Sequence, residues 1–396
     1  MRASKQSLLG ATFLIAGTIV GGGILALPVE TGMAGFMPSI LTMAIAWAFM
    51  TLTGLYYAEA NLWLKGESHV MTMASKLLGP FGKYTALILF LFIDYASLVG
   101  YISGGGVLAG HFIEWVLGIR IDRTVELFIF ALGFGSLFYL GTKTIGRINS
   151  ILVAGLIGTY FGLISLGAGE IKAAMLSVMN WKAVPMALPL VLTTFSFQMI
   201  VPSLTPYLNY DSKAIKKAII CGTSVPFFIY LIWQAVVLGI VPVDKLIMAY
   251  EQGSSATEPM RAIMENRYLM YCADAFAFFA IVTSFLGIGL SLYDFLSDSI
   301  KIQKKGVGKL FLSILVIAPS LFFAIIYPRA FLVAFEVTGG YGDSILNGLI
   351  PIAMIWMGRY IKNLDGPMRV WGGKKVLILM ALFALLVITI QTLSFF

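Results

Sequence analysis

The feature that most constrains this chain is a series of apolar runs, each about twenty residues long, that recur along its whole length. A run of that length crosses the hydrocarbon core of a bilayer as an α-helix. Hydrophobic residues make up 59% of the 396 residues and charged residues only 12%, whereas a soluble domain carries about 25% charged residues. The sequence therefore predicts an all-α polytopic membrane protein.

The runs and the loops between them predict eleven transmembrane helices. Their approximate bounds are 7–30, 35–62, 82–113, 124–141, 145–168, 186–208, 217–240, 268–298, 309–327, 330–358 and 375–395. Because the longest connection, about 241–267, is too short for a soluble domain, we expect residues 1–396 to form a single transmembrane domain.

Positive charge is distributed unequally between the two sets of alternate loops. The set that includes the N-terminus carries 19 of the 27 lysines and arginines, and the other set carries 8. Since positive residues are retained on the cytoplasmic side, we expect a cytoplasmic N-terminus and, with an odd number of spans, an outside C-terminus. The net charge of +8 lies in these loops and does not indicate nucleic-acid binding. The two cysteines form no CxxC or His/Cys cluster, so neither a disulfide nor a metal site is predicted.

The first span is interrupted in its middle. From Ala16 to Pro28 it reads AGTIVGGGILALP, with Gly17 and three consecutive glycines at 21–23. Glycine costs a helix interior about 1 kcal/mol relative to alanine, and irregular backbone persists in a bilayer only inside protein or beside water. A broken helix at this depth is typical of the substrate site of a secondary transporter. The alternative is that the glycines only let two helices pack closely.

A second interruption is expected in the sixth span. Pro202 and Pro206 each cost about 3 kcal/mol or more in a helix interior, and polar side chains from Thr193 to Ser203 lie near the middle of the membrane. The alternative is a proline-kinked helix whose hydroxyls satisfy its own backbone.

The spacing of the two interruptions favours a transporter. They lie five spans apart, so the two spans cross the membrane in opposite directions, and matched interruptions in inverted halves point to a binding site. We therefore expect two inverted repeats, about 7–168 and 186–358, with an additional helix at about 375–395.

Four segments resemble the hydroxy and aromatic amino acid permeases, which are the bacterial tyrosine and tryptophan permeases. They are GTIVGGGILALP in the first span, FSFQMIVPSLTPYL in the sixth, TSFLGIGLSLYDFLSD in the eighth and GGYGDSILNGLIP in the tenth. The resemblance covers essentially the whole chain. It implies a leucine-transporter-like fold of the amino acid–polyamine–organocation superfamily, with a 5+5 inverted repeat and broken helices 1 and 6. It also implies a place in the bacterial cytoplasmic (inner) membrane and import of an aromatic amino acid by proton symport. We favour tyrosine as the substrate, with tryptophan next.

A zwitterionic amino acid needs donors for its carboxylate, acceptors for its ammonium group and a pocket for its side chain. The restart of the first span offers free N–H groups, and both interruptions release carbonyls. The expected substrate-binding residues are Gly17, Thr18, Gly21, Gly22, Gly23, Tyr95, Phe195, Ser196, Phe197 and Gln198. Members of the resembled family usually carry histidine where this chain has Gln198, and we expect the Gln198 amide to contact a tyrosine hydroxyl.

Ionisable residues inside a membrane usually mark an ion or substrate path. Asp94 in the third span and Glu336 in the tenth are the expected proton carriers, and Glu59 is expected to lie at the interface. The alternative is sodium coupling of another neutral amino acid through the hydroxyls of Thr283 and Ser284. No other cofactor is expected.

Two other function classes are less consistent with the sequence. An enzyme is disfavoured because no HExxH, GxSxG or paired His/Asp cluster occurs in it. A channel is disfavoured because the polar groups concentrate at the interruptions and do not form a continuous lining. The expected partners are an amino acid substrate and the lipid bilayer, without an obligatory protein partner.

Overall fold

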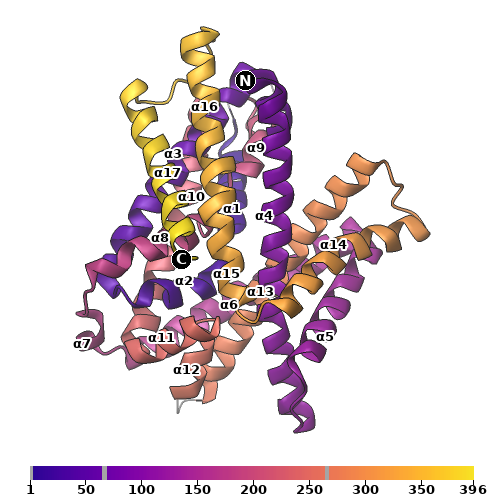
Figure 1. The fold of residues 1–396 in the computed structure, drawn as a ribbon, viewed down its shortest axis with the longest axis vertical. Helices are drawn as coiled ribbons and strands as arrows, with labels where there is room; N and C mark the ends of the chain where they lie inside the picture. The colour runs from indigo at the N-terminus through magenta and orange to yellow at the C-terminus, as the bar shows by residue number, and fades with distance from the viewer. Residues whose placement is uncertain (1–2, 65–68, 264–266) are drawn as a thin grey trace.

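The computed structural model describes residues 3–64, 69–263 and 267–396, and all of the regular structure in these ranges is helical. Arg2 and Lys65, which belong to the positive charges counted above, lie outside the described residues. Figure 1 shows long helices that run side by side, with the short helices α7, α11 and α12 at the end away from the N-terminus.

The membrane spans agree with the sequence prediction. In the described residues, ten elements are long and apolar enough to cross a membrane, and the bent pair α1 (Lys5–Ile19) and α2 (Gly23–Gly32) makes an eleventh. The other helices of the spans are α3 (Phe36–Trp63), α4 (Val70–Leu117), α5 (Arg123–Gly135), α6 (Thr142–Gly167), α8 (Val184–Thr193), α9 (Val201–Tyr207), α10 (Ser212–Ile240), α13 (Arg267–Ile300), α14 (Val307–Ile326), α15 (Ala330–Val337), α16 (Ile350–Trp356) and α17 (Lys374–Leu393). The short connecting helices are α7 (Ala173–Leu176), α11 (Val243–Gln252) and α12 (Thr257–Ile263).

The third span differs from its predicted bounds. The helix α4 begins at Val70, well before the predicted start at residue 82, and it changes direction at Gly79. Gly79 has φ +78°, a left-handed conformation that glycine adopts without steric cost, and Pro80 follows it. The residues before Gly79 therefore form a separate helical arm that leads into the span.

Both predicted interruptions are present. The helices α1 and α2 are bent by 56° across Val20–Gly22. In the sixth span, α8 ends at Thr193 and is followed by irregular backbone, a 3₁₀ turn at Gln198–Ile200 (η4) and then α9. The tenth span is irregular in another way, because it widens into a π-helix over Thr338–Leu349 (η5) between α15 and α16. Such π-helical turns are rare and occur frequently at functional sites.

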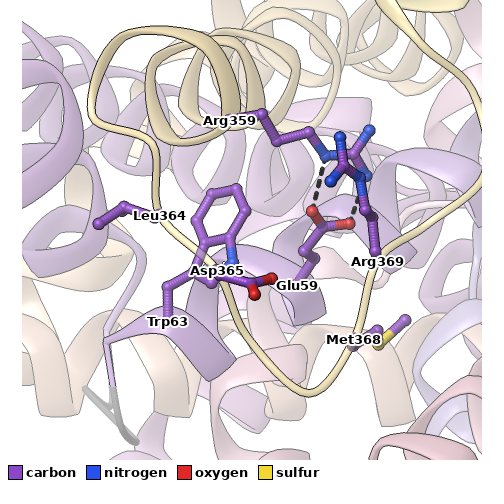
Figure 2. A pocket seen from close by; sticks show the side chains of 7 residues that line it. All are labelled: Glu59, Trp63, Arg359, Leu364, Asp365, Met368 and Arg369. Atoms are coloured by element: carbon purple, nitrogen blue, oxygen red, sulfur yellow. Dashed lines mark hydrogen bonds and ion pairs between the residues drawn. The ribbon is translucent and has the colours of Figure 1, made fainter.

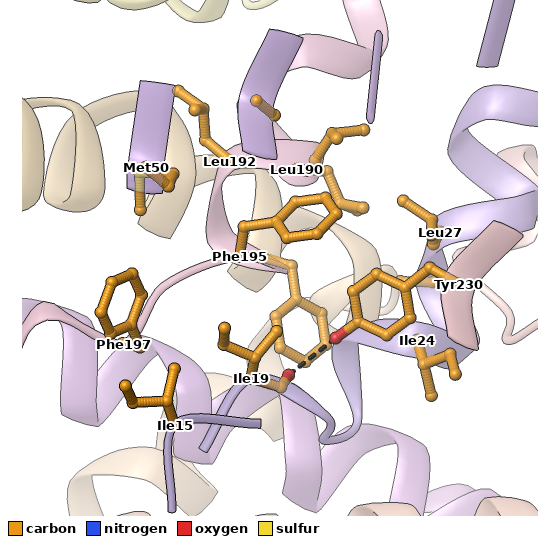
Figure 3. Packing of buried hydrophobic residues seen from close by; sticks show 14 of the residues in the cluster. Ile15, Ile19, Ile24, Leu27, Met50, Leu190, Leu192, Phe195, Phe197 and Tyr230 are labelled. Carbon is orange, nitrogen blue, oxygen red and sulfur yellow. Dashed lines mark hydrogen bonds between the residues drawn. The ribbon is translucent and has the colours of Figure 1, made fainter. Parts of the chain in front are cut away.

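The interrupted spans form the centre of the molecule. In the sixth and tenth spans 61% of the most apolar window is buried, against 22% in α6. Every residue of α2 is buried. Figure 3 shows how apolar side chains from α1, α2, α3 and α8 surround the two interruptions. The peripheral helices α5, α6, α14 and α17 therefore leave their other faces to lipid.

A buried ion pair ties α3 to the end of the tenth span. The Arg359 guanidinium donates to both carboxylate oxygens of Glu59, at 2.7 and 2.5 Å, as Figure 2 shows. Arg359 also donates to the carbonyls of Val370 and Gly372, and the Val370 N–H donates to Glu59. Glu59 is 1% exposed and is therefore enclosed by the protein near the end of α3. Its place at the membrane interface stays a prediction, and its ion pair could not be predicted locally because the partner comes from a distant span.

We predict that Arg359→Met destabilises the protein by about 3–5 kcal/mol, because it leaves the Glu59 carboxylate buried without its partner. Thermal unfolding of the detergent-solubilised protein measures the effect. The control is Arg369→Met, which removes an exposed arginine from the loop between the tenth span and α17. The double variant Glu59→Gln/Arg359→Met should recover part of the loss. Equal melting of Arg359→Met and Arg369→Met would contradict the prediction.

Candidate functional site

The two interruptions are joined by one tyrosine of α10. The Tyr230 hydroxyl lies 2.7 Å from the Ile19 carbonyl and 3.0 Å from the Thr194 carbonyl. Figure 3 shows this hydroxyl directed at the end of α1. A phenol carries a single proton, so the two carbonyls share one donor. One turn later in α10, the Trp233 indole N–H donates to the Ile24 carbonyl at 2.8 Å. Tyr230 therefore satisfies carbonyls that the interruptions release, and Trp233 satisfies a carbonyl whose helical donor is absent because Pro28, four residues after Ile24, has no N–H.

The consecutive glycines allow three elements to approach the start of α2. The Gly22 N–H donates to the Ser284 hydroxyl of α13 at 3.0 Å. A Cβ at Gly21 would lie 2.6 Å from Ser284 Oγ, and one at Gly22 would lie 2.6 Å from Cε1 of Tyr101. At Gly23 it would lie 3.1 Å from Cγ2 of Thr194. The structure thus brings Gly21, Gly22 and Gly23 together with Ser284, as expected for one site.

The other two expected residues of the first span lie apart from this contact. Gly17 and Thr18 occupy an exposed face of α1. The Thr18 hydroxyl donates to the Leu14 carbonyl of its own helix at 2.8 Å. Among the described residues outside its own helical turn, no atom lies within 4 Å of a Cβ placed at Gly17.

The aromatic residues of the second interruption point into the core. Phe195 and Phe197 are 1% and 2% exposed. The Phe195 ring packs edge-on against Tyr230 with 5.3 Å between ring centroids, and Phe197 packs against Gly54 of α3. In this structure both rings help to hold the interruption in place.

Gln198 is fully buried, and its amide is engaged by the protein. Its Nε2 donates to the Met50 carbonyl at 3.1 Å and to the Thr53 hydroxyl at 3.0 Å. Its Oε1 accepts from the Phe197 N–H at 2.9 Å. The side chain therefore fastens the second interruption to α3.

The tyrosine of α4 that reaches the site is Tyr101, which was not among the expected substrate-binding residues. The expected Tyr95 instead donates to the Leu315 carbonyl of α14 at 3.0 Å. Tyr101 lies against Gly22 and is edge-on to Phe335 of α15, with 5.6 Å between ring centroids. Tyr95 and Tyr101 are six positions apart, a spacing that turns them to different faces of the helix.

A polar cluster links the second interruption to the π-helix of the tenth span. The Asp343 carboxylate is fully buried and accepts from the hydroxyls of Thr193 and Ser196, each at 2.8 Å. Asn347, one turn after Asp343, donates to it at 2.6 Å and to the Ser196 hydroxyl at 2.9 Å. Ser196 was an expected site residue, whereas Asp343, an acid noted in the tenth span, and Asn347 were not among the expected site residues. Their spacing in GGYGDSILNGLIP was the available signal, since residues four apart share a helix face.

The expected ion-coupling residues lie in three places. Asp94 is 7% exposed, and its Oδ2 has no hydrogen-bond partner within the described residues. Glu336 lies in α15, where its Oε1 is likewise without a partner in that part of the chain. The Thr283 hydroxyl donates to the carbonyls of Phe279 and Ala280 in its own helix.

The loop helices α11 and α12 cover the α2 side of the site. The Ala256 N–H, between them, donates to the Leu25 carbonyl of α2 at 2.9 Å. In α12, Glu258 lies 3.6 Å from His111 of α4. Burial, and secondarily the nearby Asp274 carboxylate, raises the pKa of Glu258 to about 7. This cover fixes the loop to α2 and α4.

We predict that Gly22→Leu abolishes uptake without lowering the amount of protein in the membrane, because the new side chain would displace Tyr101 from the start of α2. The matched control is Gly158→Leu on an exposed face of α6, where nothing lies within 4 Å of the added Cβ. Uptake in cells and immunoblots of membranes provide the measurement. If Gly22→Leu retained uptake, the contact between Gly22 and Tyr101 would not be part of the transport site.

Comparison of the sequence with known proteins identifies its family. Residues 4–391 match the model of the tryptophan/tyrosine permease family. The tryptophan-specific transport protein of Haemophilus influenzae is 30% identical over 406 residues, covering 99% of this chain and 97% of that protein. The tyrosine-specific transport system 1 of the same organism is 27% identical over 388 residues, covering 96% of each. The low affinity tryptophan permease of Escherichia coli (strain K12) is 26% identical over 400 residues, covering 97% of this chain and 95% of that protein.

These matches span the complete set of helices, including both interruptions. A permease is a transporter and not an enzyme, and the family resemblance drawn from the four sequence segments is confirmed. The chain belongs to the tryptophan/tyrosine permease family.

Proposed function

We propose that this protein imports an aromatic amino acid across the bacterial cytoplasmic membrane by proton symport, with tyrosine favoured and tryptophan next. The observation that carries the proposal is the junction of two broken spans at Tyr230. Relatives named for tyrosine and for tryptophan transport align over nearly the whole chain, which supports an aromatic substrate.

The proposed architecture is a leucine-transporter-like 5+5 inverted repeat within one transmembrane domain. Its support is the placement of the bent pair α1/α2 and the interrupted pair α8/α9 five spans apart. The unequal distribution of lysine and arginine supports a cytoplasmic N-terminus and an outside C-terminus.

In the proposed binding mode, the substrate carboxylate lies at the N-terminus of α2. The first N–H groups of a helix have no partner in their own helix, and Ser284 takes only that of Gly22. The N–H groups of Gly21 and Gly23 remain for the carboxylate. Carbonyls at 194–197 accept from the ammonium group, because a carbonyl oxygen has two lone pairs and Tyr230 uses one. Tyr101 and Phe335 form the aromatic wall.

We assign Gln198 a positioning role within this site. Its amide connects η4 to α3 through three hydrogen bonds. A direct contact with a substrate hydroxyl would require the amide to exchange one of these partners. Gln198 therefore shapes the pocket through the path of residues 194–197.

The conformation supports alternating access. The α2 half of the first span is buried at every residue and held by the loop at Ala256, whereas α1 exposes Gly17 and Thr18. In the proposed orientation this state is closed toward the outside. Movement of α1 and α2 about the glycines between them would change the side from which the site is reached.

Proton coupling is favoured by the intramembrane carboxyl groups of Asp94 and Glu336, each of which has an enclosed oxygen without a partner in the part of the chain that the structure describes. Sodium coupling through Thr283 and Ser284 is the alternative, and the contact of Ser284 with Gly22 favours it.

Uptake of radiolabelled tyrosine by the purified protein in liposomes tests the proposal. We expect accumulation under an inward proton gradient alone, and competition by unlabelled tryptophan and phenylalanine but not by lysine. Empty liposomes and an ionophore that collapses the gradient are the controls. Accumulation only under a sodium gradient would contradict proton coupling and support sodium coupling through Thr283 and Ser284. Competition by aliphatic but not aromatic amino acids would contradict the substrate class.

A further inference from the structure

A second carboxyl group lies beside Glu336 and was not expected to have a role. Glu30 of α2 is 3% exposed, and its Oε2 has no hydrogen-bond partner within the described residues. The helices α2 and α15 pack against each other, and the two carboxyl groups interact electrostatically. Glu336 Oε1 is also unpartnered in the described part of the chain. A buried acid and a half-buried acid, each with an enclosed unpartnered oxygen in the described residues, thus lie on two packed helices at the α2 side of the site.

One arginine contributes positive charge near both carboxyl groups. The Arg329 guanidinium, at the start of α15, interacts electrostatically with Glu30 and with Glu336. It donates to the Tyr250 carbonyl of α11 at 3.0 Å and lies 4.8 Å from the centre of the Tyr250 ring. The titratable and charged groups of this cluster are therefore Glu30, Glu336, Arg329 and Tyr250.

The charges of the cluster balance only when one carboxyl group is protonated. With both ionised, two negative charges face one positive charge in a buried place, and a surplus buried charge is costly. With one proton bound, the charge of the single remaining carboxylate is balanced by the charge of Arg329 and the cluster is neutral. Like charges held close together share a proton in this way.

The cluster is connected to the broken sixth span. The carbonyl of Phe335, the residue before Glu336, accepts from the Thr193 hydroxyl at the end of α8. Glu30 lies on α2, the helix whose start contacts Ser284 and Tyr101. A change in either helix therefore changes the distance between the two acids.

We propose that Glu30 and Glu336 together form the binding site of the coupling proton, with Arg329 as their shared counter-ion, an inference that rests on the proposed proton symport. The shared proton lets α2 and α15 close against each other, and its loss drives them apart through the repulsion of two carboxylates. Glu30 is the residue that makes proton binding at Glu336 change the packing of α2 against α15, because it supplies the second negative charge.

The test compares two transport modes of the purified protein in liposomes. Gradient-driven accumulation of tyrosine requires proton coupling, whereas counterflow exchange of labelled for unlabelled tyrosine requires only a working substrate site. The variants are Glu30→Gln and Glu336→Gln. In each, the positive charge of Arg329 balances the remaining carboxylate, which then has no need of a proton. The control is Glu251→Gln, which removes an exposed carboxylate next to Tyr250.

We expect Glu30→Gln and Glu336→Gln to keep counterflow and to lose accumulation, while Glu251→Gln keeps both. If either variant accumulated tyrosine at the wild-type level, the proposal that Glu30 and Glu336 together bind the coupling proton would be contradicted. Loss of counterflow in both would also overturn it, because the acids would then serve substrate translocation itself. A wild-type protein that fails to accumulate tyrosine in a proton gradient would instead contradict the proposed function.

Discussion

The structure depends on the satisfaction of backbone groups that two broken helices release inside a bilayer. A carbonyl or N–H without a partner costs several kcal/mol in hydrocarbon. Tyr230 of α10 donates to carbonyls at the interruptions, Trp233 of α10 donates to the Ile24 carbonyl just after the first one, and Ser284 of α13 accepts an N–H there. Three side chains from two intact helices thus make the irregular backbone stable where a substrate can reach it.

The positions of the interruptions could be predicted because their causes are local. Glycines and prolines act on the backbone where they stand, so the residues around Gly22 and Pro202 indicated both breaks. The spans followed from apolar runs of the right length. The partners could not be predicted in the same way. Tyr230 lies in an unbroken span, and the choice of Tyr101 over Tyr95 depends on the rotation of α4 against α2.

The same limitation explains the acids. The sequence shows which carboxyl groups lie in spans, but their roles depend on partners from distant helices. Glu59 is neutralised by Arg359, and Asp343 is surrounded by the donors Thr193, Ser196 and Asn347. Glu30 and Glu336 both interact electrostatically with Arg329, and each keeps an oxygen without a partner among the described residues. A buried acid that is already satisfied holds helices together, and one that is not satisfied is available to bind a proton.

The central claim is that one hydroxyl holds both interruptions in a common site. Hydrogen–deuterium exchange of the Tyr230→Phe variant tests it most directly, with Tyr271→Phe, at an exposed tyrosine of α13, as the control. The account predicts faster exchange at residues 19–24 and 194–200 together, and weaker tyrosine binding, because two buried carbonyls lose their donor. Unchanged exchange at both segments, or a change at only one, would contradict the claim.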